Sequence, residues 1–143
     1  MSRVSIQPQA VPAASQPLLD QIQQAFGATP NMFKAVSNSP AALQSMWGFF
    51  GALGKGTLGA RLGEQLAVAI ANANRCEYCL AAHTVLGQNA GATGADMAAA
   101  QVGRSGDPRT AAALAFALKV VGQRAQVDDA DFTSLRTAGF DDG

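Results

Sequence analysis

The arrangement of helix-forming residues in blocks constrains the fold of this chain more than any other feature. Alanine recurs throughout, β-branched residues do not alternate with polar ones, and glycine and proline fall between the apolar blocks. Alanine has the highest helix propensity, whereas half-buried strands need apolar and polar residues to alternate. The sequence therefore predicts an all-α fold, a single-domain bundle of six to seven helices joined by short loops.

Capping signals indicate where these helices begin. Ser39 is a capping residue followed by proline at the first helical position, and Thr93 is followed by an acidic residue three positions on. We expect an N-terminal arm over residues 1–14 and a helical domain over residues 15–143. The expected helices cover about 15–26, 39–53, 58–73, 76–89, 93–102, 107–121 and 128–138, with one or two turns at 31–37. One wide apolar stripe is expected on the helix that begins at Ser39, formed by Leu43, Met46, Trp47, Phe50 and Leu53.

Composition excludes several classes of protein. Of 143 residues, 48% are apolar and 14% charged, which is typical of a globular chain and not of a disordered one. Ten basic residues balance ten acidic ones, so nucleic acid and anionic membranes are not expected partners, and self-association is permitted. We find neither a signal peptide in residues 1–17 nor the roughly 18 consecutive apolar residues of a membrane helix, and we expect a cytoplasmic location.

Two cysteines and the only histidine form the sequence C-x-x-C-x-x-x-H at Cys76, Cys79 and His83. On one helix these side chains fall within an arc of about 60°, and thiols three residues apart can form a disulfide. In a reducing compartment such a pair is more often catalytic or metal-binding than a permanent cross-link. A thiol peroxidase needs a nucleophilic thiol, a base that ionises it and a second thiol that resolves the sulfenic acid.

Glu64 is the fourth candidate site residue. It lies twelve positions before Cys76 on the preceding helix, and a corner at Asn72–Arg75 would pack the two helices antiparallel. The carboxylate would then face the cysteines and the histidine from an apolar helix. Because a buried carboxylate without a partner is costly, we expect Glu64 to pair with His83 or with a bridging water.

The spacing of these residues resembles the signature of the AhpD-like proteins: a glutamate, an eleven-residue gap, CxxC, a three-residue gap and a histidine. These belong to the carboxymuconolactone decarboxylase superfamily and include alkyl hydroperoxidase D and peroxidase-related proteins. The resemblance covers roughly residues 15–141 and includes the Asn38-Ser39-Pro40 start, the segment 72–83 and the Ala138-Gly139-Phe140 end. CxxC alone is a weak signal, but this spacing in an alanine-rich helical chain is a strong one.

The resemblance implies a role for each residue. Cys79 would be the peroxidatic thiolate, Cys76 the resolving thiol, and Glu64 with His83 the proton relay that ionises Cys79. It also implies a homo-oligomer, a trimer or hexamer, that acts on a hydroperoxide without a cofactor or metal. The reductant would be a dithiol on a lipoyl- or thioredoxin-like protein.

The chain departs from alkyl hydroperoxidase D at two places. Between its cysteines that protein has a histidine, whereas this chain has Glu77-Tyr78. The peroxidase-related branch also lacks this histidine. Proteins of this branch usually continue past the segment 139–142 into another helix, and we expect the shorter end here to affect the oligomer or the openness of the pocket.

The leading hypothesis is a thiol-dependent antioxidant oxidoreductase that reduces hydroperoxides or a partner's disulfide. A redox-sensing or carrier protein with little turnover is the first alternative, and the missing histidine favours it. A carboxymuconolactone decarboxylase-like lactone enzyme is the second, although such members work without a CxxC pair. A zinc module is the third, ranked lower because ligands on one helical stripe rarely reach tetrahedral geometry.

Overall fold

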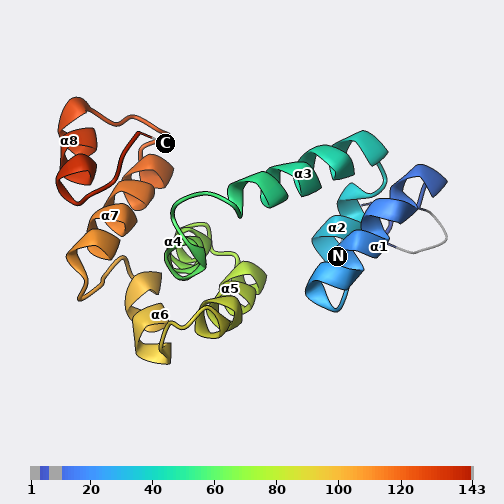
Figure 1. Ribbon diagram of the computed structural model, residues 1–143, viewed down its shortest axis with the longest axis horizontal. Coiled ribbons are helices and arrows are strands. Elements are labelled where there is room, and N and C mark those ends of the chain that lie inside the picture. Colours follow the sequence, from blue (N-terminus) through green and yellow to red (C-terminus); the bar gives the residue numbers. More distant parts are fainter. Residues whose placement is uncertain (1–3, 7–10, 143) are drawn as a thin grey trace. The chain divides into compact units, whose positions relative to one another are not determined.

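The computed structural model describes residues 4–6 and 11–142, and all regular structure within them is helical (Figure 1). A short 3₁₀ turn, Ala13–Ser15, precedes eight α-helices. The helices are α1 (Gln16–Phe26), α2 (Asn31–Val36), α3 (Pro40–Leu53), α4 (Ala60–Ala73), α5 (Glu77–Asn89), α6 (Gly94–Gln101), α7 (Pro108–Gly122) and α8 (Asp129–Thr137). The predicted all-α class is confirmed. The helix count exceeds six to seven because residues 31–36, expected to form a turn or two, make a separate helix.

The chain divides into two compact units, residues 1–56 and 57–143. In the N-terminal arm expected over 1–14, residues 4–6 and 11–12 carry no helix, residues 13–14 belong to the 3₁₀ turn, and the others lie outside the described part. The extent of the helical domain, 15–143, stays a prediction.

Helices α1, α2 and α3 form the first unit around an aromatic centre. Phe33 is fully buried, and its ring lies 5.9 Å from those of Trp47 and Phe50. The core contains Leu19, Ile22, Phe33 and Leu43. The predicted stripe on α3 is only partly buried, since Phe50 and Leu53 are 42% and 63% exposed.

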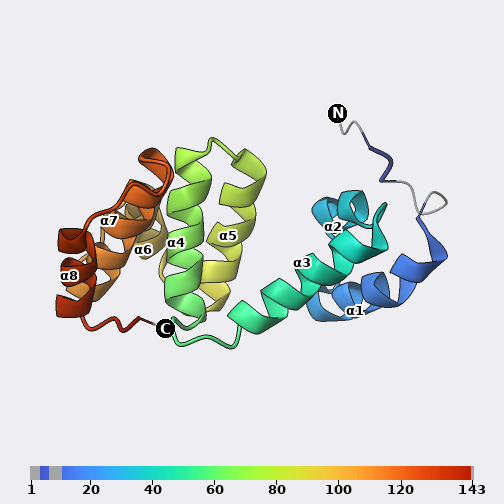
Figure 2. The same cartoon turned by 90° about the horizontal axis from the view of Figure 1, so that it is seen from above.

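Helix α4 is the centre of the second unit, with α5, α6 and α7 packed against it and α8 against α7 (Figure 2). The core of this unit consists of Val68, Ala69, Ala92, Met97, Ala100 and Leu114. Several of these side chains are small, so the helices approach closely. The α4–α5 pair carries all four residues of the predicted site.

Side-chain caps begin five of the helices, four of them at predicted positions. Ser39 accepts a hydrogen bond from the backbone N–H of Ala42, and Asp107 accepts one from Thr110. Thr93 and Asp128 each form a reciprocal capping box with an aspartate three residues on. Helix α4 begins at Ala60, two residues later than expected, and Gly59 at its N-cap has no side chain with which to cap it.

Candidate functional site

A left-handed corner connects α4 to α5. Arg75 has a φ of 55°, its N–H donates to the carbonyl of Asn72 at 3.0 Å, and the N–H of Cys76 donates to the carbonyl of Ala71 at 2.9 Å. This bond pattern is a Schellman motif, in which the residue with positive φ usually is glycine. The corner ends α4 and places Cys76 directly at the start of α5.

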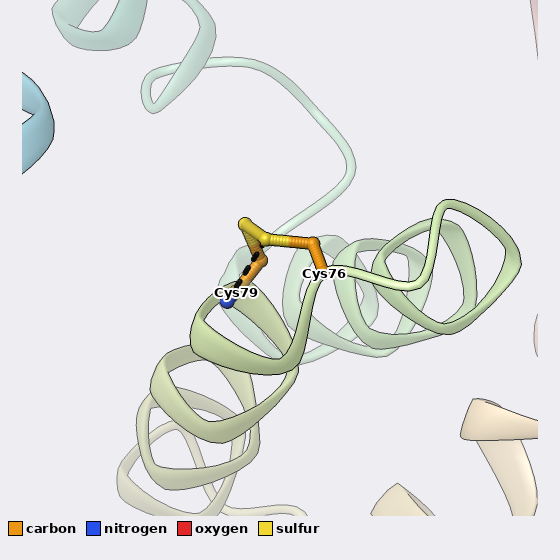
Figure 3. Close-up of a disulfide and its surroundings, with 2 residues drawn as sticks. All are labelled: Cys76 and Cys79. Carbon is orange, nitrogen blue, oxygen red and sulfur yellow. Dashed lines mark hydrogen bonds between the residues drawn. A yellow bond between two sulfur atoms is a disulfide. The ribbon is translucent and has the colours of Figure 1, made fainter. Parts of the chain in front are cut away.

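Cys76 is the N-cap of α5, and Cys79 is the third residue of that helix. The two form a disulfide (Figure 3), and their Cα atoms lie 5.3 Å apart. Backbone angles of −94° and 90° place Cys76 just before the helix, which begins near Cys76 as the sequence predicted. Its sulfur takes the place of a capping oxygen and accepts the N–H of Cys79 at 3.3 Å. After reduction, this N–H and the helix dipole would favour a thiolate at Cys76.

Glu64 and His83 form a hydrogen-bonded pair between α4 and α5. His83 Nδ1 lies 2.7 Å from Glu64 Oε2, and the two side chains are 33% and 24% exposed. The expected pairing is therefore present in the structure. When Nδ1 carries the ring proton, its N–H donates a hydrogen bond to the carboxylate. Nε2 of the neutral imidazole is then free to accept a proton. A carboxylate in this position also holds the ring in one orientation.

The two pairs meet on α5. His83 follows Cys79 by four residues, one helical turn, so their side chains lie on the same face. Cys79, from the disulfide, and His83, from the bond to Glu64, thus lie on one turn of α5. Such a set of groups can carry out thiol redox chemistry: the thiols supply two electrons, and the imidazole–carboxylate pair accepts a proton.

Gly87 is a site residue that the sequence reasoning missed. It lies one turn beyond His83, and a Cβ atom added there would be 3.3 Å from Glu64 Cβ and would overlap the buried side chain of Met97. Glycine at this point lets α5 approach α4 closely enough for the Glu64–His83 bond. The available signal was a glycine inside a helical block, four residues after the histidine.

Among the described residues, no group of three or more histidine, cysteine, aspartate or glutamate side chains is placed to hold a metal ion. Within the same residues, no helix has both the length and the apolar character needed to cross a membrane.

The model of the carboxymuconolactone decarboxylase family matches residues 40–120, more than half of the chain. The chain belongs to this family. The matched segment contains Glu64, both cysteines and His83. No curated protein matches the sequence.

Solved structures agree with the family assignment. An uncharacterized peroxidase-related protein from Silicibacter sp. TM1040 is 25% identical with a TM-score of 0.84, over 99% of this chain and 76% of that one. A peroxidase-related protein with an alkylhydroperoxidase AhpD core, from Ralstonia eutropha JMP134, is 28% identical with a TM-score of 0.82, over 99% and 80%. The AhpD core protein of Rhodospirillum rubrum has the same fold, with 22% identity and a TM-score of 0.60 over 92% and 98%. The predicted membership of the AhpD-like group of this family is confirmed.

Proposed function

We propose that this member of the carboxymuconolactone decarboxylase family is a thiol-dependent oxidoreductase that reduces hydroperoxides, or a partner's disulfide, through Cys76 and Cys79. The observation that carries the proposal is the position of the cysteine pair one turn from a histidine that is itself hydrogen-bonded to Glu64. Peroxidase-related relatives of the same fold support it.

The reaction with a hydroperoxide takes two steps. The Cys79 thiolate attacks the terminal peroxide oxygen, the O–O bond breaks, and the alkoxide leaves as the alcohol after taking a proton. Cys79 is then a sulfenic acid. The Cys76 thiolate attacks its sulfur, forms the disulfide and releases hydroxide, which leaves as water once protonated. Two thiols have been oxidised and one peroxide has been reduced to an alcohol and water.

Each neighbouring group has a role in these steps. Nε2 of His83 takes the proton of Cys79, and the Glu64 carboxylate stabilises the imidazolium that results. The N–H of Cys79 stabilises the thiolate of Cys76 as it attacks, and stabilises it again as the leaving group when a reductant opens the disulfide at Cys79. The same helix start therefore serves both halves of the cycle.

A dithiol protein must restore the two thiols, and a lipoyl- or thioredoxin-like protein is the partner that we propose. Tyr78, between the cysteines, is 60% exposed and offers such a partner a contact surface. We also propose a cytoplasmic homo-oligomer, a trimer or hexamer. Light scattering after gel filtration measures that state, and a monomer would contradict it.

A redox-sensing or carrier role is the second candidate. The observation in its favour is Tyr78, which stands with Glu77 between the cysteines where alkyl hydroperoxidase D has a histidine. With one relay member fewer, the thiols would still respond to oxidation but would turn over slowly.

Dithiol-driven reduction of cumene hydroperoxide separates these functions. Dihydrolipoamide and dithiothreitol serve as donors, and the loss of hydroperoxide is followed for the wild type, Cys76→Ser and Cys79→Ser. A peroxidase gives turnover well above the reaction of free dithiol, and Cys79→Ser abolishes it. Turnover in Cys79→Ser equal to that of the wild type contradicts the proposal. A wild-type rate no faster than free dithiol, with the disulfide still forming, assigns the redox-carrier role.

A further inference from the structure

The unit 57–143 contains a cavity that neither cysteine lines. It has a volume of about 680 Å³ and lies where the first turns of α4 and α7 meet one residue of α6 and the loop between α6 and α7. Gly59, Arg61, Gln65, Asp96, Asp107 and Arg109 are among the residues that line it. None of the four proposed redox residues does, so the proposed thiol chemistry leaves this cavity unexplained.

The start of α4 opens into this cavity without a cap. Gly59 is the N-cap residue and offers no side-chain acceptor, and the first turn contains no acidic residue. The first intrahelical bond runs from the N–H of Gly63 to the carbonyl of Gly59, so the N–H groups before it have no partner within the helix. Uncapped N–H groups and the positive end of the helix dipole attract an anion.

Gln65, one turn further along α4, is an independent sign of a ligand. It is only 4% exposed and lines the cavity, yet its side chain makes no hydrogen bond to any described residue. Every fully enclosed side-chain nitrogen or oxygen in the described part of the chain has a hydrogen-bond partner. The carboxamide of Gln65 must therefore reach the cavity itself, because a buried amide without a partner is costly.

Two arginines and two aspartates line the cavity, so its charged side chains balance. Arg61 and Arg109 each occupy the second position of a helix, where a positive charge opposes the helix dipole. Asp96 already accepts hydrogen bonds from the N–H of Thr93 and from Arg61, at 2.9 and 3.0 Å. Asp107 accepts the N–H and the hydroxyl of Thr110, at 2.8 and 2.6 Å.

Through its Oδ2 atom each carboxylate binds at the start of its own helix, α6 or α7, and both guanidinium groups keep unused donors. Arg61 uses one of its five N–H donors on Asp96, and Arg109 stacks over the ring of Phe140 at 4.0 Å. Hydrogen bonds from Thr93 and from Thr110 hold the pKa values of Asp96 and Asp107 below their usual range, so both stay ionised at neutral pH. The free donors of the cavity are the remaining guanidinium N–H groups, the first N–H groups of α4 and the carboxamide of Gln65.

We propose that this cavity binds a small organic anion through its carboxylate or phosphate group. The N–H groups at the start of α4 and the guanidinium groups of Arg61 and Arg109 would hold the anionic group, and the carboxamide of Gln65 would bind a polar atom next to it. The site is distinct from the redox residues.

Titration of the full-length, ¹⁵N-labelled chain followed by NMR tests this site. The probes are inorganic phosphate and benzoate, added at constant ionic strength. The expected result is a saturable shift of the backbone signals of residues 60–62 and of the side-chain amide of Gln65. The probe with the lower dissociation constant identifies the group as phosphate or carboxylate. Shifts that grow without saturating, or none with either probe, would overturn the proposal.

Matched variants distinguish a built site from general attraction by positive charge. Arg61→Gln should weaken binding about tenfold or more, whereas Arg104→Gln, which removes an exposed arginine outside the cavity, should leave it unchanged. Gln65→Leu keeps the volume but removes the donors and should weaken binding too, with a melting curve to show that the variant is folded. Equal losses in Arg61→Gln and Arg104→Gln would overturn the site.

Discussion

At the scale of single residues, the proposed thiol chemistry depends on the Glu64–His83 bond. An isolated imidazole on α5 could rotate and present either nitrogen to Cys79. The carboxylate on α4 binds Nδ1 at 2.7 Å and so directs Nε2 away from itself. Glu64 touches no reacting atom in the proposed cycle, which makes it a positioning residue.

Replacing Glu64 by glutamine tests this role. Glu64→Gln keeps the size of the side chain but removes its charge, so the imidazolium formed during proton transfer loses its stabilisation. We expect oxidation of the reduced protein by peroxide to slow about 10- to 100-fold while the free energy of unfolding changes little. Glu77→Gln, on the exposed first turn of α5, is the matched control and should react like the wild type. Equal rates in all three proteins would contradict the relay.

Arg75 is a residue whose backbone, and not its side chain, matters to the site. Its φ of 55° is strained for a residue with a Cβ atom, and the N–H of Cys76 just after it completes the corner. Arg75→Gly should raise the free energy of unfolding by up to about 1 kcal/mol, measured by urea unfolding. Arg75→Val should lower it, because a β-branched residue tolerates positive φ least. A stabilising effect of valine would contradict this assignment.

At the scale of helices, sequence reasoning succeeded where a local signal decides the structure. Helices were expected to start at Ser39, Thr93, Asp107 and Asp128, and each of these side chains accepts a backbone N–H because capping depends only on the next few residues. The CxxC spacing likewise predicted that the thiols would meet.

The sequence was less informative where neighbours from elsewhere decide. Phe50 and Leu53 follow a helical apolar period, but burial depends on how much surface α1 and α2 offer. Cys76 is the N-cap of α5 because Arg75 before it adopts a left-handed conformation that arginine rarely takes. Gly87 was overlooked because its importance comes from Glu64 and Met97, which lie on other helices.

The close approach of α4 and α5 at Gly87 leads to a prediction. Gly87→Ala forces Met97 or Glu64 to move, and we expect a loss of about 1–3 kcal/mol in the free energy of unfolding with slower thiol oxidation. Gly63→Ala is the matched control, since nothing lies within 4 Å of its added Cβ. That variant should gain about 0.5–1 kcal/mol from helix propensity. A stabilising Gly87→Ala would show that the helices do not depend on this contact.

Helix α8 is held to α7 by a charge-dependent contact. Lys119 Nζ lies 2.6 Å from Asp131, which also accepts the N–H of Asp128 at 2.8 Å. The hydrogen bond from Lys119, followed by that from Asp128, lowers the pKa of Asp131 from its usual 3.8. The carboxylate therefore stabilises the fold above about pH 3.8, and this contribution is lost as the pH falls through the lower pKa of the folded state.

Asp131→Asn should accordingly lower the melting temperature at neutral pH. The difference from the wild type should shrink as the pH falls below 3.8, since the wild type then loses the same contribution. Asp129→Asn, at an exposed position in the same first turn, should have a smaller effect. A difference that stays constant down to acid pH would contradict the role of this carboxylate.

At the scale of the whole molecule, two compact units divide the chain, and the proposed redox chemistry belongs to one of them. Glu64, the cysteines and His83 all lie in residues 57–143, on two adjacent helices. Large apolar side chains are exposed on both units, among them Phe49 at 64%, Val85 at 56% and Val102 at 58%. With no net charge to oppose association, such surfaces fit the homo-oligomer that we propose.

Stopped-flow oxidation of the reduced protein tests the central claim, that Cys79 is an activated thiol resolved by Cys76, most directly. Hydrogen peroxide and an organic hydroperoxide are each mixed with the wild type, Cys76→Ser and Cys79→Ser. Our account predicts fast oxidation in the wild type and in Cys76→Ser, with a disulfide formed only in the wild type. In Cys79→Ser the fast oxidation should be lost. Slow oxidation in all three proteins, or fast oxidation that survives in Cys79→Ser, would contradict it.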